Sequence, residues 1–392
     1  MRHFFNSKIW QRNRLLHFSI LLLALLFIAA LSSCSDGNKP DDKSNQVERA
    51  VLVYIVSDNT LSGYDADDIH EMLRAAQAGD LGENRLIIYH AGRTDVPRLG
   101  EITSQGLVSL VEYDRTVNSV TAERMNKVIN DFKSLVPARN YGLVLWSHAS
   151  AWASNEPPTG PDSAVSPQSY GDDRGAHMDI DVLADVLADK GFEFIYFDCC
   201  HMASVEVAYE LRHATPYIIG SATEIPSPGM PYDLTMPLLL KGDLIGAART
   251  TFDWYDALSG SSRTCTMSVI RTSELDNLAA ATRRIFEKHP VLPDDYKPLN
   301  YRTAKPFYCY DLAHYIRALS TDEDFADWQQ ALDKCVIFKA NTPKLWNSVS
   351  LEGHCGLSCM IVDYMSQLGN NLSWQYYYTT RWWNDVVSAS IR

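Results

Sequence analysis

The segments YGLVLWSH, residues 141–148, and FEFIYFDCC, residues 192–200, decide the fold that we predict for this chain. Each begins with a short run of β-branched and aromatic residues, which is typical of a buried strand. The first segment ends at His148, and the second ends in an Asp-Cys-Cys triplet whose last residue is Cys200. Because parallel sheets carry their sites beyond the carboxyl ends of the strands, we expect the imidazole and the thiol to meet at one edge.

Strands and helices alternate around these two segments. The expected strands are 50–56, 85–90, one around Ile102, 107–113 and 217–221, and the expected helices are 64–78, one from Thr121, 180–190 and 202–212. Residues 152–175 are rich in Pro, Ser, Gly and Asp and are predicted to form a loop. The alternation favours an α/β fold in which helices sandwich a mostly parallel sheet.

The pattern loosens after Gly229. Helices are expected at 244–258, 273–288, 311–319 and 324–334, and strands at 265–270 and 357–362. We therefore expect a core at residues 49–233 and a C-terminal α+β companion subdomain, residues 234–392, packed on it.

The composition is that of a globular protein, with 46% hydrophobic and 21% charged residues. The formal net charge of −13 repels nucleic acid and suits a cationic substrate, so no nucleic-acid partner is expected. The cysteines include no CxxC pair, and a zinc site is not predicted. Five of them either pack as small buried side chains or form one or two disulfides: Cys265, Cys309, Cys335, Cys355 and Cys359.

The first 33 residues have the pattern of an export signal. Basic side chains precede an apolar stretch, residues 15–31, and small residues follow it directly before Cys34. This arrangement resembles a bacterial lipobox, which implies cleavage before Cys34, a lipid on its thiol and anchoring to a bacterial membrane, with the outer membrane as the expected one. An uncleaved anchor helix is the alternative. Residues 34–48 are polar and charged, as in a flexible tether.

Cys200 and His148 are residue types that can act as a nucleophile and its acid–base partner. A thiol attacks as the thiolate, which a neighbouring imidazole helps to form. A helix that begins at residue 202 would add backbone N–H groups that favour the same negative charge. By themselves, the two residues also fit a core cysteine and a satisfied core histidine.

Four longer segments resemble sequence blocks of the clostripain family, which are cysteine peptidases of the caspase-like clan. They are FDCCHMASVEVAYEL around Cys200, LVLWSHASAW around His148, SATEIPSPGMPYD at 221–233 and GLSCMIV at 356–362. The likeness extends over about residues 50–390 in the expected order. It implies a caspase-like fold and a cysteine endopeptidase with a Cys-His dyad that cleaves peptide bonds after Arg or Lys.

The resemblance also implies roles for individual residues. It makes Cys200 the nucleophile, places Cys199 where a small alanine is usual, and matches Asp198 to the acid of the primary specificity pocket. A helix N-cap is the alternative role for Asp198. The backbone N–H groups of Ala149 and Cys200 are expected to stabilise the oxyanion.

Three positions depart from the family's pattern. Ala149 and Ala151 replace glycines, and alanine does not readily adopt a positive φ. His201 stands where a leucine-like residue is common, and we expect its side chain to be exposed, with a contact to substrate as the alternative. These departures leave open a catalytically weak or inactive surface lipoprotein that binds peptide or glycan through its nine Trp and twenty Tyr residues. An α/β hydrolase is not supported, because the sequence has no G-x-S-x-G motif.

Members of the family often mature by cutting themselves between the histidine and the cysteine, after a basic residue. Arg174 is the only Lys or Arg between Ala149 and Lys190, so we expect any self-cleavage to follow Arg174. Asp172 and Asp173 offer oxygen ligands for Ca²⁺, which some relatives use, and an acidic surface loop is the alternative. No other metal or cofactor is indicated.

Overall fold

The structure, a computed structural model, describes residues 46–153, 169–303, 305, 307–368 and 372–390. Residues Val47–Arg392 form one compact unit, which carries the fold. The predicted export signal and Cys34 lie outside the described residues. Within the described ranges, no helix combines the length and the apolar character that a bilayer-spanning helix needs.

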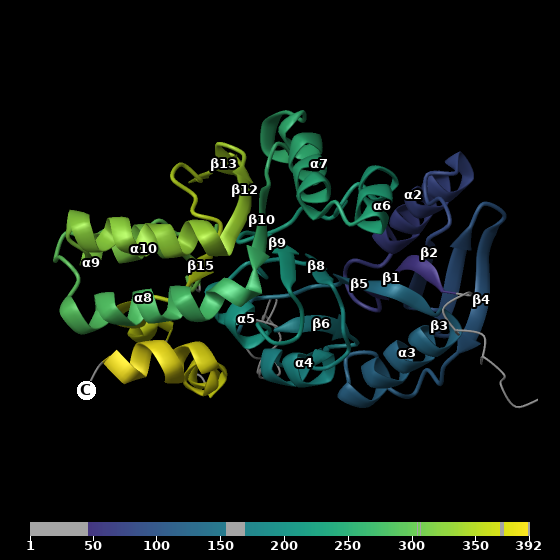
Figure 1. Ribbon diagram of the computed structural model, residues 1–392, viewed down its shortest axis with the longest axis horizontal. Helices are drawn as coiled ribbons and strands as arrows, with labels where there is room; N and C mark the ends of the chain where they lie inside the picture. The colour runs from purple at the N-terminus through teal and green to yellow at the C-terminus, as the bar shows by residue number, and fades with distance from the viewer. Residues whose placement is uncertain (1–45, 154–168, 304, 306, 369–371, 391–392) are drawn as a thin grey trace, which may run out of the picture. The chain divides into compact units, whose positions relative to one another are not determined.

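A nine-stranded sheet runs through the unit in the order β12-β10-β9-β8-β5-β1-β2-β3-β4 (Figure 1). Its five central strands are parallel: β9 (Tyr217–Gly220), β8 (Phe194–Asp198), β5 (Ala138–Trp146), β1 (Val47–Val56) and β2 (Arg85–Ala91). The outer strands are antiparallel: β3 (Arg98–Thr103) and β4 (Gly106–Glu112) at one side, and β10 (Thr266–Arg271) and β12 (Val336–Asn341) at the other. The predicted α/β fold with a mostly parallel sheet is confirmed.

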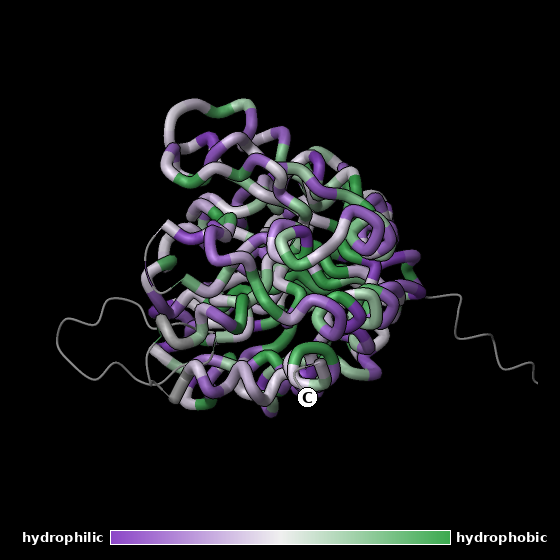
Figure 2. The backbone as a smooth tube through the Cα atoms, turned by 90° about the vertical axis from the view of Figure 1, so that its left-hand side faces the viewer, coloured by the Kyte–Doolittle hydropathy of each residue, from purple (hydrophilic) through white to green (hydrophobic). Residues whose placement is uncertain are grey.

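Helices cover both faces of the sheet (Figure 1). One face packs against α2 (Tyr64–Ala78), α6 (Tyr232–Lys241) and α7 (Leu244–Asp256), and the other against α3 (Ala122–Leu135), α4 (Ile180–Leu187) and α5 (Val205–Glu210). Successive residues of a strand point to opposite faces, so Val51, Val53 and Ile55 of β1 join the first layer, while Leu52 and Tyr54 join the second. Figure 2 shows the apolar segments gathered in the interior of this unit.

The C-terminal half adds a second group of helices beside the sheet. Three of them, α8 (Leu275–Lys288), α9 (Leu312–Leu319) and α10 (Asp322–Cys335), lie side by side (Figure 1). Small pairings complete it: β11 (Tyr310–Asp311) with β15 (Ser358–Cys359), and β13 (Lys344–Leu345) with β14 (Val349–Ser350), followed by α11 (Leu372–Gln375). Because β10 and β12 of this half extend the central sheet, the two halves share one core, and the boundary at residue 233 stays a prediction.

Most predicted elements are confirmed, and the exceptions have physical causes. Residues 152–175 are not all loop, because β6 (Tyr170–Asp173) and β7 (Ala176–Met178) form a hairpin. Its turn residues, Arg174 and Gly175, have φ of 56° and 82°, as a tight hairpin turn requires. Helix α6 was not predicted, since Pro237 inside it is a helix breaker by rule. Of the strand expected at 357–362, only β15 forms.

The helix expected from residue 202 begins later, at Val205. Ser204 caps it, with its side chain accepting a hydrogen bond from the Val207 N–H. Cys200 therefore lies in the turn between β8 and this cap, five residues before α5 begins.

The described cysteines form no disulfide. Six of them are buried with free thiols, including all five that the sequence left open, and Cys200 alone is partly exposed.

Candidate active site

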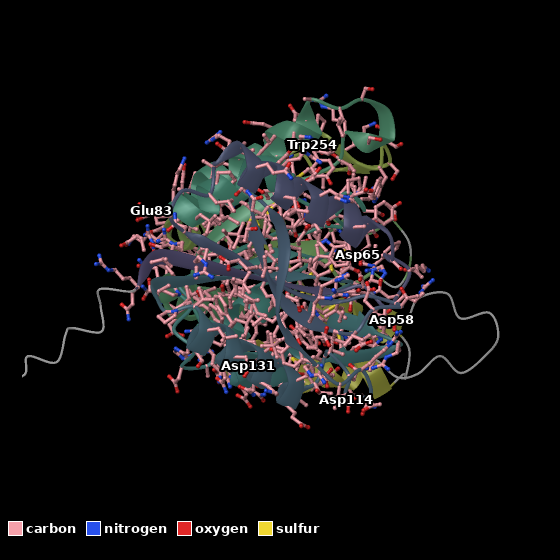
Figure 3. The ribbon with its side chains drawn as sticks, turned by 90° about the vertical axis from the view of Figure 1, so that its right-hand side faces the viewer. Asp58, Asp65, Glu83, Asp114, Asp131 and Trp254 are labelled. Atoms are coloured by element: carbon pink, nitrogen blue, oxygen red, sulfur yellow. The ribbon has the colours of Figure 1, made fainter. Side chains whose placement is uncertain are left out.

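The sheet register brings His148 and Cys200 to the same edge. Strands β5 and β8 are adjacent and parallel, and Trp146 lies opposite Asp198. His148 and Cys200 each follow this pair by two residues, so both lie just beyond the carboxyl ends of neighbouring strands. Figure 3 shows Asp58 and Asp65, which follow β1, at the end of the sheet opposite to Glu83, which precedes β2. The two strands therefore end at the same edge of the sheet, as expected for His148 and Cys200.

The ring of His148 is held from the β1–α2 loop. Its Nε2 lies 2.7 Å from Thr60 Oγ1, and Asn59 fixes the loop by donating from Nδ2 to the carbonyl oxygens of Val56 (3.1 Å) and Asp172 (2.7 Å). Burial lowers the pKa of His148, and the charge of Asp172 partly opposes this effect. The ring is thus a neutral base at pH 7. Thr60 was missed, although it follows the end of a third parallel strand at this edge.

The thiol of Cys200 receives a hydrogen bond from a different element than the one predicted. The backbone N–H of Ile225, in the loop after β9, donates to its Sγ at 3.3 Å. Burial raises the pKa of the Cys200 thiol to about 11, and this N–H works in the opposite direction. The prediction that a helix N-terminus supports the thiolate is wrong, because α5 begins at Val205. Cys199 is buried and donates to the carbonyl of Leu145 at 3.0 Å.

No hydrogen bond joins Cys200 to His148 in the part of the chain that the structure describes. The imidazole is bound to Thr60 and the thiol to Ile225. Catalytic hydrogen bonds often tighten only when substrate is present, so this resting arrangement is compatible with a dyad.

Asp198 is buried at the end of β8. Its Oδ2 accepts hydrogen bonds from the Met230 N–H (3.1 Å) and the Tyr232 hydroxyl (2.9 Å). Burial raises its pKa from 3.8 to about 6, although both hydrogen bonds lower it. Asp198 does not cap a helix, since Ser204 caps α5. Gly229 is required beside it, because a Cβ there would lie 2.6 Å from Asp198 Oδ2.

A second buried carboxyl group lies near Asp198. Asp68, in α2, is 2% exposed and accepts a hydrogen bond from Trp146 Nε1 at 2.7 Å. Burial and the charge of Asp198 raise its pKa to about 9, so it is protonated at pH 7. Sequence analysis missed it because an aspartate on a helix usually faces solvent. Beside Asp198 the structure leaves a cavity of about 10 Å³, enough for about one water molecule.

Ala149 pairs with Tyr170 as an isolated antiparallel bridge. The hydrogen bonds on either side join Ser150 N–H to Ser169 O (3.4 Å) and Gly171 N–H to His148 O (2.9 Å). In this pattern the N–H of Ala149 itself points away from the partner strand. Positive φ occurs at Ala151 (59°), and Ala149 is not among the described residues that adopt it. Of the two alanines that replace glycines, Ala151 is therefore the one with a strained backbone.

The side chain of His201 is not exposed as predicted. It is 2% exposed and has a φ of 63°. Its Nε2 lies 3.3 Å from Arg302 Nη1. Burial and the charge of Arg302 lower the pKa of His201 to about 3.

Arg174 occupies the tip of the β6–β7 hairpin. Its guanidinium lies 3.0 Å from the Asp173 carboxylate and 4.0 Å from that of Asp58. The backbone N–H of Arg174 donates to the Asp58 carbonyl at 3.1 Å. Asp173 also accepts from the Ser119 N–H at 2.6 Å, and Asp172 accepts from the Gly175 N–H at 2.9 Å. Within the described ranges no three His, Cys, Asp or Glu side chains gather as metal ligands. The calcium site considered above stays a prediction.

Comparison with protein families decides the classification. The model of the clostripain family matches residues 53–348. The chain belongs to the clostripain family. Members of this family are cysteine peptidases, and the expected caspase-like fold agrees with the solved structures of such enzymes. Comparison with curated proteins gave no match.

Solved C11 proteases resemble this clostripain-family chain over nearly their whole length. A secreted C11 cysteine protease from Bacteroides thetaiotaomicron, bound to an irreversible peptide inhibitor, is 29% identical, covers 88% of this chain and 99% of its own, and has a TM-score of 0.75. An inactive zymogen C11 protease from Parabacteroides distasonis is 29% identical over 87% and 98%, with a TM-score of 0.73. Iotapain, a secreted C11 protease from B. thetaiotaomicron, has a TM-score of 0.75 at 23% identity, over 87% and 99%, and supports the fold only.

Proposed function

We propose that this protein is a cysteine endopeptidase that hydrolyses peptide bonds after Arg or Lys, with Cys200 as nucleophile and His148 as acid–base partner. The observation that carries the proposal is the β5–β8 register, which places both residues two positions past the same strand pair. The partial exposure of Cys200, among otherwise buried described cysteines, supports its role as the attacking thiol.

The hydrogen bond to Thr60 suggests how the imidazole works. When Nε2–H is donated to Thr60, Nδ1 is the nitrogen that can accept the proton of Cys200. The thiolate then attacks the scissile carbonyl carbon, and the N–H groups of Ala149 and Cys200 stabilise the oxyanion. The protonated His148 gives its proton to the leaving amine, and water hydrolyses the thioester.

Asp198 is the proposed partner of the basic side chain before the scissile bond. Its buried carboxylate is poorly solvated, as the raised pKa shows, so a guanidinium or ammonium group would gain a strong charge-assisted hydrogen bond. Because the cavity at Asp198 is small and is lined by Glu224, Ile225 and Pro226, we expect this loop to move before such a side chain enters.

Two further steps of maturation belong to the proposal. The chain is exported through residues 1–33 and lipidated at Cys34, and the description of a similar C11 protease as secreted supports export. Self-cleavage follows Arg174, which requires the hairpin turn to open and its contacts with Asp58 and Asp173 to break.

A positional peptide library, applied to the chain from Val47 onward, tests this function. We expect cleavage after Arg and Lys that is lost in Cys200→Ala and kept in Cys199→Ala. Cleavage after other residues would remove Asp198 from the specificity pocket but keep the dyad. The absence of cleavage by both intact and Arg174-cut protein would favour the alternative of a lipoprotein that binds peptide or glycan without catalysis.

A further inference from the structure

Arg302, from the C-terminal half, reaches the turn that carries the nucleophile. Its Nη1 lies 3.3 Å from Nε2 of His201, the residue directly after Cys200, and donates to the Tyr308 hydroxyl at 2.7 Å. The guanidinium carbon lies 4.4 Å from the centre of the Tyr308 ring. Three contacts on two side chains therefore fix the position of this cation.

The charge of Arg302 has no anionic partner among the described residues. The two hydrogen bonds of its guanidinium go to uncharged groups, and its Nε is buried without any partner. Arg302 as a whole is partly exposed, but its buried Nε has left water without gaining a hydrogen-bond partner, which is unfavourable. The chain has a net charge of −13, yet this arginine has no ion-pair partner among the described residues, so its guanidinium is able to bind an anion.

His201 is arranged to hold this cation. Its backbone N–H donates to the Thr223 carbonyl at 2.9 Å, and its Nδ1 lies 3.4 Å from the Ala222 carbonyl. When Nδ1–H is donated there, Nε2 is left as the acceptor for Arg302. The leucine-like residue usual at this position could not accept that hydrogen bond. The His201–Arg302 contact therefore goes with this chain's departure from the family pattern.

Cys200 directly precedes His201, so the contact between His201 and Arg302 brings the cation to the turn that carries this thiol. Burial and the carboxylates of Glu224 and Asp198 raise its pKa, whereas the Ile225 N–H and the charge of Arg302 lower it. Among the charged side chains that act on this thiol, Arg302 is the one that favours the thiolate.

We infer that Arg302 is an electrostatic positioning residue, whose guanidinium, held by His201 and Tyr308, supplies the counter-charge of the Cys200 thiolate. The inference rests on the proposed function, since it takes Cys200 as the nucleophile. An acidic side chain of the substrate is the other anion that this cation could meet, and the experiment below separates the two.

The test measures alkylation of Cys200 by iodoacetamide as a function of pH, with the adduct located by mass spectrometry. In Arg302→Gln we expect the apparent thiol pKa to rise by about one unit, which lowers the rate at pH 8 about 10-fold. Arg302→Lys, which keeps the charge, should restore most of the rate. Arg249→Gln is the matched control, because Arg249 also stacks on an aromatic ring, Phe338, but lies on α7.

Folding is checked in the same experiment, since the other described thiols are buried and react only when the fold is lost. Should Arg302→Gln fail to fold, Tyr308→Phe removes one anchor of the cation and should lower the alkylation rate about 3-fold.

An unchanged pH profile in folded Arg302→Gln would overturn the inference. Unchanged alkylation with selective loss of cleavage of acidic peptides would also overturn it, in favour of a substrate-binding cation. Because the alkylation rate does not depend on peptide hydrolysis, wild-type protein that cleaves no peptide would count against the proposed function alone.

Discussion

Asp198→Asn should make the fold more stable at pH 8 while it removes cleavage after basic residues. Both hydrogen bonds to the Asp198 side chain reach one oxygen, Oδ2. An asparagine can place its carbonyl oxygen there, keep the bonds to Met230 and Tyr232, and put its NH₂ group where Oδ1 was. The substitution therefore removes the negative charge and little else.

The structure gives the size of the stability effect. Folding raises the pKa of Asp198 from 3.8 to about 6, so the folded state disfavours the ionised form. The penalty is absent below about pH 3.8 and complete above about pH 6. At about 1.4 kcal/mol per pH unit, it amounts to about 3 kcal/mol. With an unfolding entropy of about 2.1 cal/mol/K per residue over the folded unit, the variant should melt roughly 4 °C higher at pH 8.

The activity of Asp198→Asn should change in the opposite direction. Removing one partner of a buried charge pair costs about 2–5 kcal/mol, or roughly 30- to 5,000-fold in kcat/KM for an Arg substrate. Thermal melts at pH 4 and pH 8 and hydrolysis of a peptidyl-Arg substrate measure the two effects. Asp233→Asn, which neutralises a partly exposed acid of α6 that is paired with Arg74, is the control. A lower melting temperature at pH 8, or full activity on Arg substrates, would refute the reasoning.

Three further predictions follow from single contacts. Thr60→Val removes the hydroxyl that holds His148 and should lower kcat about 10- to 100-fold with little change in KM. Thr60→Ser keeps the hydroxyl and should keep the kcat of the wild type. Equal kcat in the two variants would exclude a positioning role for Thr60. Gly229→Ala places a Cβ 2.6 Å from Asp198 Oδ2 at a φ of 64°. It should lower the free energy of unfolding by about 1–2 kcal/mol in a denaturant titration and raise KM for Arg substrates. An unchanged denaturation midpoint and an unchanged KM would contradict this. Arg174→Gln should leave the chain intact on a denaturing gel under conditions that cut the wild type, and two fragments from the variant would place the cut elsewhere.

The elements that position the dyad follow from local sequence. One apolar run of strand length ends just before His148, and another ends just before the Asp-Cys-Cys triplet that contains Cys200. Parallel pairing of the two strands is enough to bring these ends together. Helices such as α3 were also predicted, because Thr121 is an N-cap and an apolar stripe follows it. These features depend on residues within one element, which a single sequence contains.

The parts that could not be predicted depend on contacts between distant segments. The Ile225 N–H reaches the thiol, Thr60 reaches the imidazole, and Arg302 reaches His201 across 101 positions. The exposure predicted for His201 was wrong. A polar residue in a turn is usually solvated, but this side chain contacts Arg302, the Ala222 carbonyl and the Tyr308 ring, which lie far away in the sequence. Sequence patterns do not record which loop closes over a site.

Adduct mapping with a peptidyl-Arg acyloxymethyl ketone tests the central claim most directly. If Cys200 is the nucleophile and His148 its proton acceptor, mass spectrometry should find the inhibitor on Cys200 of the wild type. Labelling should disappear in Cys200→Ala and fall strongly in His148→Ala, while Cys199→Ala labels normally. An adduct on any other residue, or undiminished labelling of Cys200→Ala, would contradict the account.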